Sequence, residues 1–146
     1  MTATTEWTLE HIRQHIAEGL PLVPLFNLEV VEATAVRGRL RLNAGEHVSR
    51  PGGSIAGPVL FALADVVTYV LILAARHDPD AVTVDLTINF LRAARALPLL
   101  AAAVPLRGGR RLFTAEVRIT EADGTGALVA QATTTWSLSS AASARA

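Results

Sequence analysis

The sequence predicts an α+β domain in which a curved antiparallel sheet of about five or six strands wraps around one long central helix. A continuous apolar stretch from Ala56 to Ala75 has the length and character of a helix that is buried on all sides. The segments after it alternate apolar and polar residues with a period of two, which is typical of strands with one buried face. The connections between these segments are short, and short connections favour antiparallel neighbours in a meander.

Three elements are expected before the apolar stretch. Residues 7–20 are amphipathic, with Thr8 as a candidate N-cap and with Gly19 and Pro21 at the end, so they predict a short N-terminal helix. We expect a first strand at 24–32 and a second at 36–42, where apolar and basic residues alternate. A loop over 43–54 leads from the second strand to the long helix.

Four strands are expected after the long helix, at 82–91, 97–107, 113–120 and 130–138. The second of them is the most continuously apolar, which predicts a more buried strand. Thr83 and Asp85 fall on the polar face of the first of these strands and are weaker candidates for a substrate-binding role. The tails, 1–6 and 139–146, are expected to be frayed. No linker or repeat is visible, so residues 1–146 are interpreted as a single domain.

Composition and charge narrow the class of function. The chain has 146 residues, 51% of them hydrophobic, which suits one domain with its own core. With 13 basic and 13 acidic side chains the formal charge is zero, which argues against a nucleic-acid-binding protein. There is no cysteine, and among the four histidines only His11 and His15 have a metal-ligand spacing, without the glutamate that a zinc-protease motif needs. We therefore expect no metal and no cofactor. No secretion signal is recognisable, which favours the cytoplasm.

The apolar stretch is also about as long as a membrane span. It carries Asp65 at its middle, however, and a central aspartate costs roughly 2.5–3.5 kcal/mol on membrane-insertion scales. The amphipathic strands would also need something apolar to cover. We therefore favour a helix inside a soluble protein that does not contact a membrane.

Asp65 is the candidate for chemistry within this helix. Only Asp65, Thr68 and Tyr69 carry a polar group between residues 56 and 75, and their spacing puts them on one helix face. A carboxylate in apolar surroundings must pair, become neutral or face a cleft. It can therefore be a structural group bonded to the backbone or to Thr68, or a catalytic group, and the glycine at the start of the helix favours the second interpretation.

Gly57 marks that start. Pro58 suits the first helical position, so the Gly57 amide would be a free donor at the positive end of the helix dipole. A carbonyl oxygen that gains negative charge would be stabilised there, although an ordinary loop-to-helix junction is the alternative. Gly57 and Asp65 are eight residues apart, or about 12 Å along a helix, so one carbonyl cannot contact both. If both serve one reaction, two subunits must share the site.

These segments resemble the hot-dog thioesterases, specifically their phenylacetate-pathway (PaaI-like) acyl-CoA thioesterases. The resemblance covers about residues 21–138. It rests mainly on two segments: the glycine-led start of the helix at 53–65, which ends in A-L-A-D, and the strand at 82–92, which ends in F-L-R. Residues 109–112 and 130–133 also fit the two later strands of the family. It implies a homodimer or homotetramer in which Gly57 polarises the thioester carbonyl and Asp65 of the facing subunit acts as base or nucleophile. CoA enters only as part of the substrate and product.

The resemblance also implies positions for the two ends of an acyl-CoA substrate. An aryl or medium-chain acyl group would lie beside the central helix, near Phe61 and Tyr69. Apart from the resemblance, the helix face that Thr68 and Tyr69 share with Asp65 suggests the hypothesis that one of them orients water or Asp65. Basic side chains would hold the CoA phosphates, because the forked guanidinium suits phosphate. By position the candidates are Arg50, Arg92, Arg110 and Arg111, each of which could instead be a solvated charge.

The chain departs from the family pattern at three points. It has Ala56 where many members place histidine, Pro58 where many have a second glycine, and Ser49 and Arg50 where some have an amide side chain. Two other functions stay open: a non-catalytic acyl-CoA-binding module, and a hydratase or dehydratase. Asp65 favours the enzyme over pure binding, and hydratase chemistry usually needs a histidine that this motif lacks.

Overall fold

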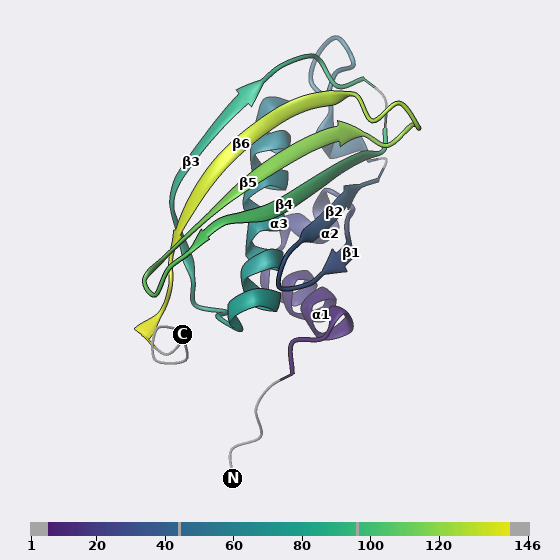
Figure 1. The fold of residues 1–146 in the computed structure, drawn as a ribbon. Helices are drawn as coiled ribbons and strands as arrows, with labels where there is room; N and C mark the ends of the chain where they lie inside the picture. Colours follow the sequence, from purple (N-terminus) through teal and green to yellow (C-terminus); the bar gives the residue numbers. More distant parts are fainter. Residues whose placement is uncertain (1–5, 44, 96, 141–146) are drawn as a thin grey trace.

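The computed structural model in Figure 1 describes residues 6–43, 45–95 and 97–140. The first half of the chain contains α1 (Leu9–Gly19), α2 (Leu22–Leu25), β1 (Leu28–Ala33), β2 (Gly38–Leu42) and a 3-10 helix (Glu46–Val48). The second half contains α3 (Gly57–Arg76), β3 (Val82–Phe90), β4 (Leu99–Gly108), β5 (Leu112–Glu121) and β6 (Leu128–Ser137).

One antiparallel sheet contains all six strands in the order β1-β2-β4-β5-β6-β3. It curves around α3, which lies across its concave side (Figure 1). Leu63, Val67 and Leu71 of α3 are completely buried there. The length and apolar composition of α3 would allow it to cross a membrane, but most of it is covered within the fold. The predicted α+β hot-dog architecture with one central apolar helix is therefore confirmed.

The predicted meander is wrong for β3. This strand pairs with β6 at the far edge of the sheet instead of with β4, the next strand in the chain. Residues 91–95 follow β3 at the end of the sheet, where the Leu91 amide donates to the Val129 carbonyl and the Ala94 carbonyl accepts from the Ile55 amide. No two-residue turn signal stands between β3 and β4, so nothing local requires a hairpin.

The N-terminal region confirms the first helix and corrects the first strand. The Thr8 side chain caps α1 by accepting a hydrogen bond from the His11 amide at 3.1 Å. The strand predicted at 24–32 begins only at Leu28, because residues 22–25 form the short helix α2. Pro24 is compatible with that helix since the first turn does not need its missing amide.

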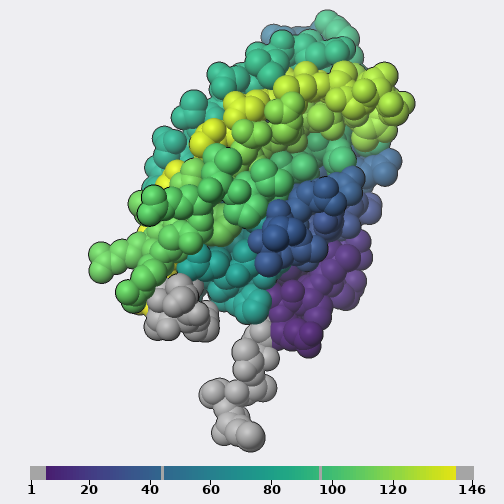
Figure 2. Space-filling view, viewed as in Figure 1, coloured from purple at the N-terminus to yellow at the C-terminus, as the bar shows by residue number. Residues whose placement is uncertain are grey.

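The expectation that 97–107 is buried holds for only half of β4. Its partner β2 has five residues and pairs with β4 only from Leu99 to Ala103. Beyond that point β4 lacks this neighbour, and Val104 and Leu106 are 39% and 57% exposed. In the space-filling view (Figure 2), β4 to β6 form one continuous outer surface, and α1 lies at the other edge beside β1 and β2.

The start of the predicted C-terminal tail is anchored. The Ser139 amide and hydroxyl both donate to the fully buried carboxylate of Asp78, at 2.7 Å each. Asp78 also accepts from the Asp80 amide, so one carboxylate fixes the loop between α3 and β3 against the end of β6. Residues 1–5 and 141–146 of the predicted tails lie outside the described residues.

Candidate active site

A β-bulge in β3 determines which side chains face the helix. Thr83 pairs with Trp136 of β6, but Asp85 pairs with Thr135, so Val84 is an extra residue in β3. Because of this extra residue, the side chains of β3 before the bulge point to the opposite faces of the sheet from those that an unbroken alternation would give them. Thr83 therefore shares the helix-facing side of the sheet with Leu86, whereas the uninterrupted pattern predicts that it shares the outer face with Asp85. This expectation is corrected for Thr83 and confirmed for Asp85, which is exposed.

Asp65 lies on α3 directly opposite this bulge. The Thr83 hydroxyl donates to Oδ1 of Asp65 at 2.6 Å, the length of a charge-assisted hydrogen bond. Burial raises the pKa of the Asp65 carboxyl above its ordinary value, and the Thr83 hydrogen bond opposes that shift. The side chain is only partly buried, so it is a carboxylate at the edge of an apolar interior and not one sealed inside it.

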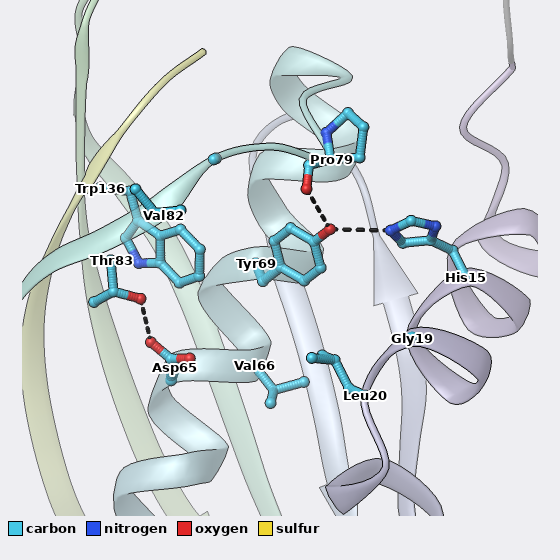
Figure 3. Close-up of a pocket in the computed structure, with 11 residues that line it drawn as sticks. His15, Gly19, Leu20, Asp65, Val66, Tyr69, Pro79, Val82, Thr83 and Trp136 are labelled. Atoms are coloured by element: carbon cyan, nitrogen blue, oxygen red, sulfur yellow. Dashed lines mark hydrogen bonds between the residues drawn. The ribbon is translucent and has the colours of Figure 1, made fainter.

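The Asp65 carboxylate opens into a cleft of about 570 Å³ between α1 and β3 (Figure 3). This volume is within the usual range for small-molecule sites, and most of the lining is apolar. The lining includes Leu20 beside α1, Val66 on α3, and Val82, Thr83 and Trp136 on the sheet. The cleft can thus hold an apolar group with a carboxylate at its side.

A hydrogen-bonded bridge of aromatic side chains crosses one end of the cleft. The Tyr69 hydroxyl donates to the Pro79 carbonyl at 2.8 Å and lies 3.0 Å from Nε2 of His15 on α1 (Figure 3). The Tyr69 ring stacks on Trp136 with 5.7 Å between ring centroids. The sequence pattern did not connect His15 or Trp136 with Asp65, because no motif links residues so distant in the chain.

Thr68 and several other predicted residues do not line this cleft. Thr68 is completely buried on the core side of α3, and its hydroxyl donates to the Ala64 carbonyl at 2.9 Å. The expectation that it shares a face with Asp65 and Tyr69 is therefore corrected, and we leave it out of the catalytic group. Phe61 is 43% exposed and also lies outside the lining of the cleft.

Gly57 lines a separate groove of about 280 Å³ at the N-terminal end of α3. Within the described ranges its amide has no hydrogen-bond acceptor, as expected for the first residue of a helix. An added Cβ would lie 3.5 Å from the Phe90 ring, an ordinary contact, so the fold itself does not require glycine here. The preceding Ala56 caps α3 without a side-chain bond, and its amide donates to Val48.

The four predicted phosphate-binding arginines fall into two groups. Arg50 and Arg92 line the groove of Gly57. Arg92 is half-exposed, and its contact with Glu121 is long, at 3.9 Å. Arg110 and Arg111 stand in the turn between β4 and β5, where Gly109 accepts a hydrogen bond from Arg76 at the other end of α3. A helix of 20 residues is about 30 Å long, so the two groups cannot serve one phosphate cluster on one chain.

Comparison with known proteins identifies the family. The model of the thioesterase superfamily matches residues 52–128, which is more than half of the chain and includes Gly57, Asp65 and Thr83. The chain belongs to this superfamily. A proposed esterase of Saccharolobus solfataricus is 33% identical over 98 residues, or 67% of this chain. The match spans 64% of that relative, which is less than two thirds of its length.

Solved structures of the thioesterase superfamily have the same fold. Zebra fish thioesterase superfamily member 2 is 27% identical, with a TM-score of 0.79 over 90% of this chain and 99% of its own. A hypothetical thioesterase from Streptococcus pneumoniae, solved with coenzyme A, is 22% identical, with a TM-score of 0.72 over 80% of this chain and 90% of its own. At this identity the second likeness concerns the fold alone.

In this thioesterase-superfamily chain, groups that could take part in acyl transfer are found in two separate places. The cleft has a carboxylate that can accept a proton or attack a carbonyl carbon, and an apolar space beside it. The Gly57 groove has an amide that can stabilise a developing oxyanion, and two guanidinium groups. Acyl transfer to water needs both kinds of group at one carbonyl.

Proposed function

We propose that the chain is an acyl-CoA thioesterase that hydrolyses an aryl- or medium-chain acyl-CoA to the free acid and CoA, of the PaaI-like type. The observation that carries the proposal is the Asp65 carboxylate, which is held by Thr83 at 2.6 Å and opens into the apolar cleft. A purely structural aspartate in a core helix would have its oxygens bonded inside the fold, without a space of about 570 Å³ in front of them.

Asp65 acts in this proposal as the general base, or as the nucleophile in a two-step route. As a base it takes a proton from water while the water oxygen bonds to the thioester carbon. The tetrahedral intermediate then expels the CoA thiolate, which receives the proton from Asp65, so water is added across the C–S bond and the carboxylate is restored. The Thr83 hydrogen bond fixes the orientation of the carboxylate during both proton transfers.

The oxyanion donor in this proposal is the Gly57 amide of a second subunit. Asp65 and Gly57 of one chain are about 12 Å apart along α3, which is too far for both to contact one carbonyl group. Two α3 helices related by a two-fold axis would place each Gly57 beside the Asp65 of the other chain, giving two equivalent sites. The protein would therefore act as a homodimer or as a homotetramer built from such dimers.

The CoA moiety would lie on the Gly57 side. Arg50 and Arg92 line that groove and present guanidinium groups to solvent, where the phosphates of CoA could bind. The structure of a Streptococcus pneumoniae relative with coenzyme A supports a CoA ligand for this fold. The acyl group would then extend into the Asp65 cleft, away from the phosphates.

The test is hydrolysis of acyl-CoA substrates by wild type and by Asp65→Asn, followed with a thiol-trapping dye. Asparagine keeps the shape and an acceptor for Thr83 but cannot take the proton, so we expect kcat to fall about 10²–10⁴-fold. Asp85→Asn is the matched control, because Asp85 lies on the outer face of β3 and should leave kcat unchanged. Equal rates for wild type and Asp65→Asn would leave a non-catalytic acyl-CoA-binding module as the better interpretation.

A further inference from the structure

The end of the Asp65 cleft at Tyr69 has a feature that hydrolysis itself does not use. Tyr69 follows Asp65 by one helical turn on α3, about 6 Å along the axis. Its hydroxyl connects α3 to two other parts of the chain, the Pro79 carbonyl at 2.8 Å and the His15 ring at 3.0 Å. In Figure 3 this bridge spans from α3 to α1 across the end of the cleft that lies away from Val66 and Leu20.

The direction of the two hydrogen bonds follows from the number of hydrogens. Burial raises the pKa of the Tyr69 phenol, so Tyr69 stays protonated and has one hydrogen to donate. A carbonyl oxygen can only accept, so that hydrogen belongs to Pro79. His15 must then donate from Nε2 to the phenol oxygen, and the chain His15, Tyr69, Pro79 has a single consistent direction.

Both ends of this bridge are fixed to the fold. Pro79 lies in the loop that the buried carboxylate of Asp78 ties to Ser139, with two bonds of 2.7 Å. His15 stands between Ile12 and Ile16, which are 0% and 1% exposed, so α1 is anchored on both sides of the histidine. The Tyr69 ring is held flat against Trp136. The bridge is therefore a firm wall of the cleft.

We propose that the His15–Tyr69 bridge is the end stop of the acyl pocket and narrows the proposed substrates to compact acyl groups, such as hexanoyl or a single aryl ring. This inference rests on the proposed function. A thioester carbonyl held at Asp65 leaves about one helical turn before the bridge, and Tyr69 and Trp136 both line the cleft there. A longer straight chain must displace the bridge or stay in solvent.

The test is a kcat/KM profile over straight-chain acyl-CoA substrates from butyryl to palmitoyl, together with phenylacetyl-CoA. We expect wild type to prefer hexanoyl and phenylacetyl and to lose activity as the chain lengthens further. His15→Ala, which opens the wall, should raise kcat/KM for lauroyl-CoA about tenfold or more and change that for hexanoyl-CoA little, since one methylene in a pocket is worth about 10–200-fold. Tyr69→Phe, which keeps the ring and breaks both bonds, should shift the profile in the same direction by less.

His11→Ala is the matched control. It removes a histidine one turn earlier on α1 that stacks on Trp7 and does not line the cleft, so its profile should follow wild type. An unchanged profile in both His15→Ala and Tyr69→Phe, with hexanoyl-CoA still hydrolysed, would overturn the end stop and leave the thioesterase proposal intact. Absence of hydrolysis by wild type across the whole panel would overturn the proposed function instead.

Discussion

The Asp65 cleft and the Gly57 groove, which both lie along α3, differ in the chemical groups that line them. The groove at the N-terminal end has an unpaired backbone amide at Gly57 and two guanidinium groups, but no carboxylate among its lining residues. The cleft at the middle of the helix has the Asp65 carboxylate and aromatic walls, but no lysine or arginine among its lining residues. The cleft and the groove therefore each have half of what thioester hydrolysis requires, which is why we propose that two chains combine to form one site.

The Asp65 cleft and the Gly57 groove also differ in how many contacts with the rest of the fold hold their lining residues in place. Gly57 contacts little, and a Cβ there would meet only the edge of the Phe90 ring at 3.5 Å and 3.7 Å. Around Asp65, by contrast, the side chains are joined by hydrogen bonds to Thr83 and by the Tyr69 bridge to α1. Substitutions at Gly57 should therefore act on catalysis with little effect on folding, whereas those around Asp65 affect both.

The loss of kcat in Gly57→Val should be the largest of the three effects described below. A branched side chain at the start of α3 keeps a substrate carbonyl away from the amide, so kcat should fall about 10²-fold, as when one oxyanion donor is lost. Steady-state hydrolysis of hexanoyl-CoA measures this, and circular dichroism checks the fold. Gly57→Ala should give an intermediate rate. A Gly57→Val enzyme with the wild-type kcat would remove the N-terminal groove from the site.

Thr83→Ala should lower kcat less than Gly57→Val does, and it should also change how kcat depends on pH. Its hydroxyl orients Asp65 and holds the pKa of that carboxyl down, against the effect of burial. Hydrolysis requires the ionised carboxylate, so activity is lost as the pH falls through the pKa of Asp65. Without Thr83 that pKa rises further, and the acid limb of the pH–kcat profile should move to higher pH, with kcat at pH 8 reduced about tenfold. Thr83→Ser should restore the wild-type profile.

The smallest of the three effects should be on stability, where Asp65→Asn should raise the melting temperature slightly. A carboxyl whose pKa is raised by folding binds its proton more tightly in the folded state, so its ionisation destabilises the protein once the pH exceeds the unfolded-state pKa. At pH 7 the variant should melt about 1–3 °C above wild type, and the difference should shrink as the pH falls towards 4. A lower melting temperature at both pH values would mean that the carboxylate contributes to stability.

The sequence predicts those features of the fold and of the site that depend on the pattern of neighbouring residues. The central helix follows from its apolar run, the strands β5 and β6 from their alternation, and the isolation of Asp65 from the absence of other charges between residues 56 and 75. These features need only neighbouring residues, so one sequence is enough to find them.

The missed features all depend on pairing between distant segments. The bulge that turns Thr83 towards Asp65 exists only in the register of β3 against β6, and a period-two pattern cannot show it. The placement of β3 beside β6, the core-facing orientation of Thr68 and the contact of His15 with Tyr69 likewise arise from how elements pack. The isolated Asp65 could be recognised in the sequence, whereas the side chains that orient it could not.

The most direct test of a shared site is complementation between two inactive chains. Asp65→Asn and Gly57→Val are co-expressed with different affinity tags, and the mixed dimers are purified on both tags in turn. One of the two sites in each mixed dimer then has an intact Asp65 facing an intact Gly57, so hydrolysis of hexanoyl-CoA should return to about half the wild-type rate. Mixed dimers as inactive as the two parents would contradict the shared site.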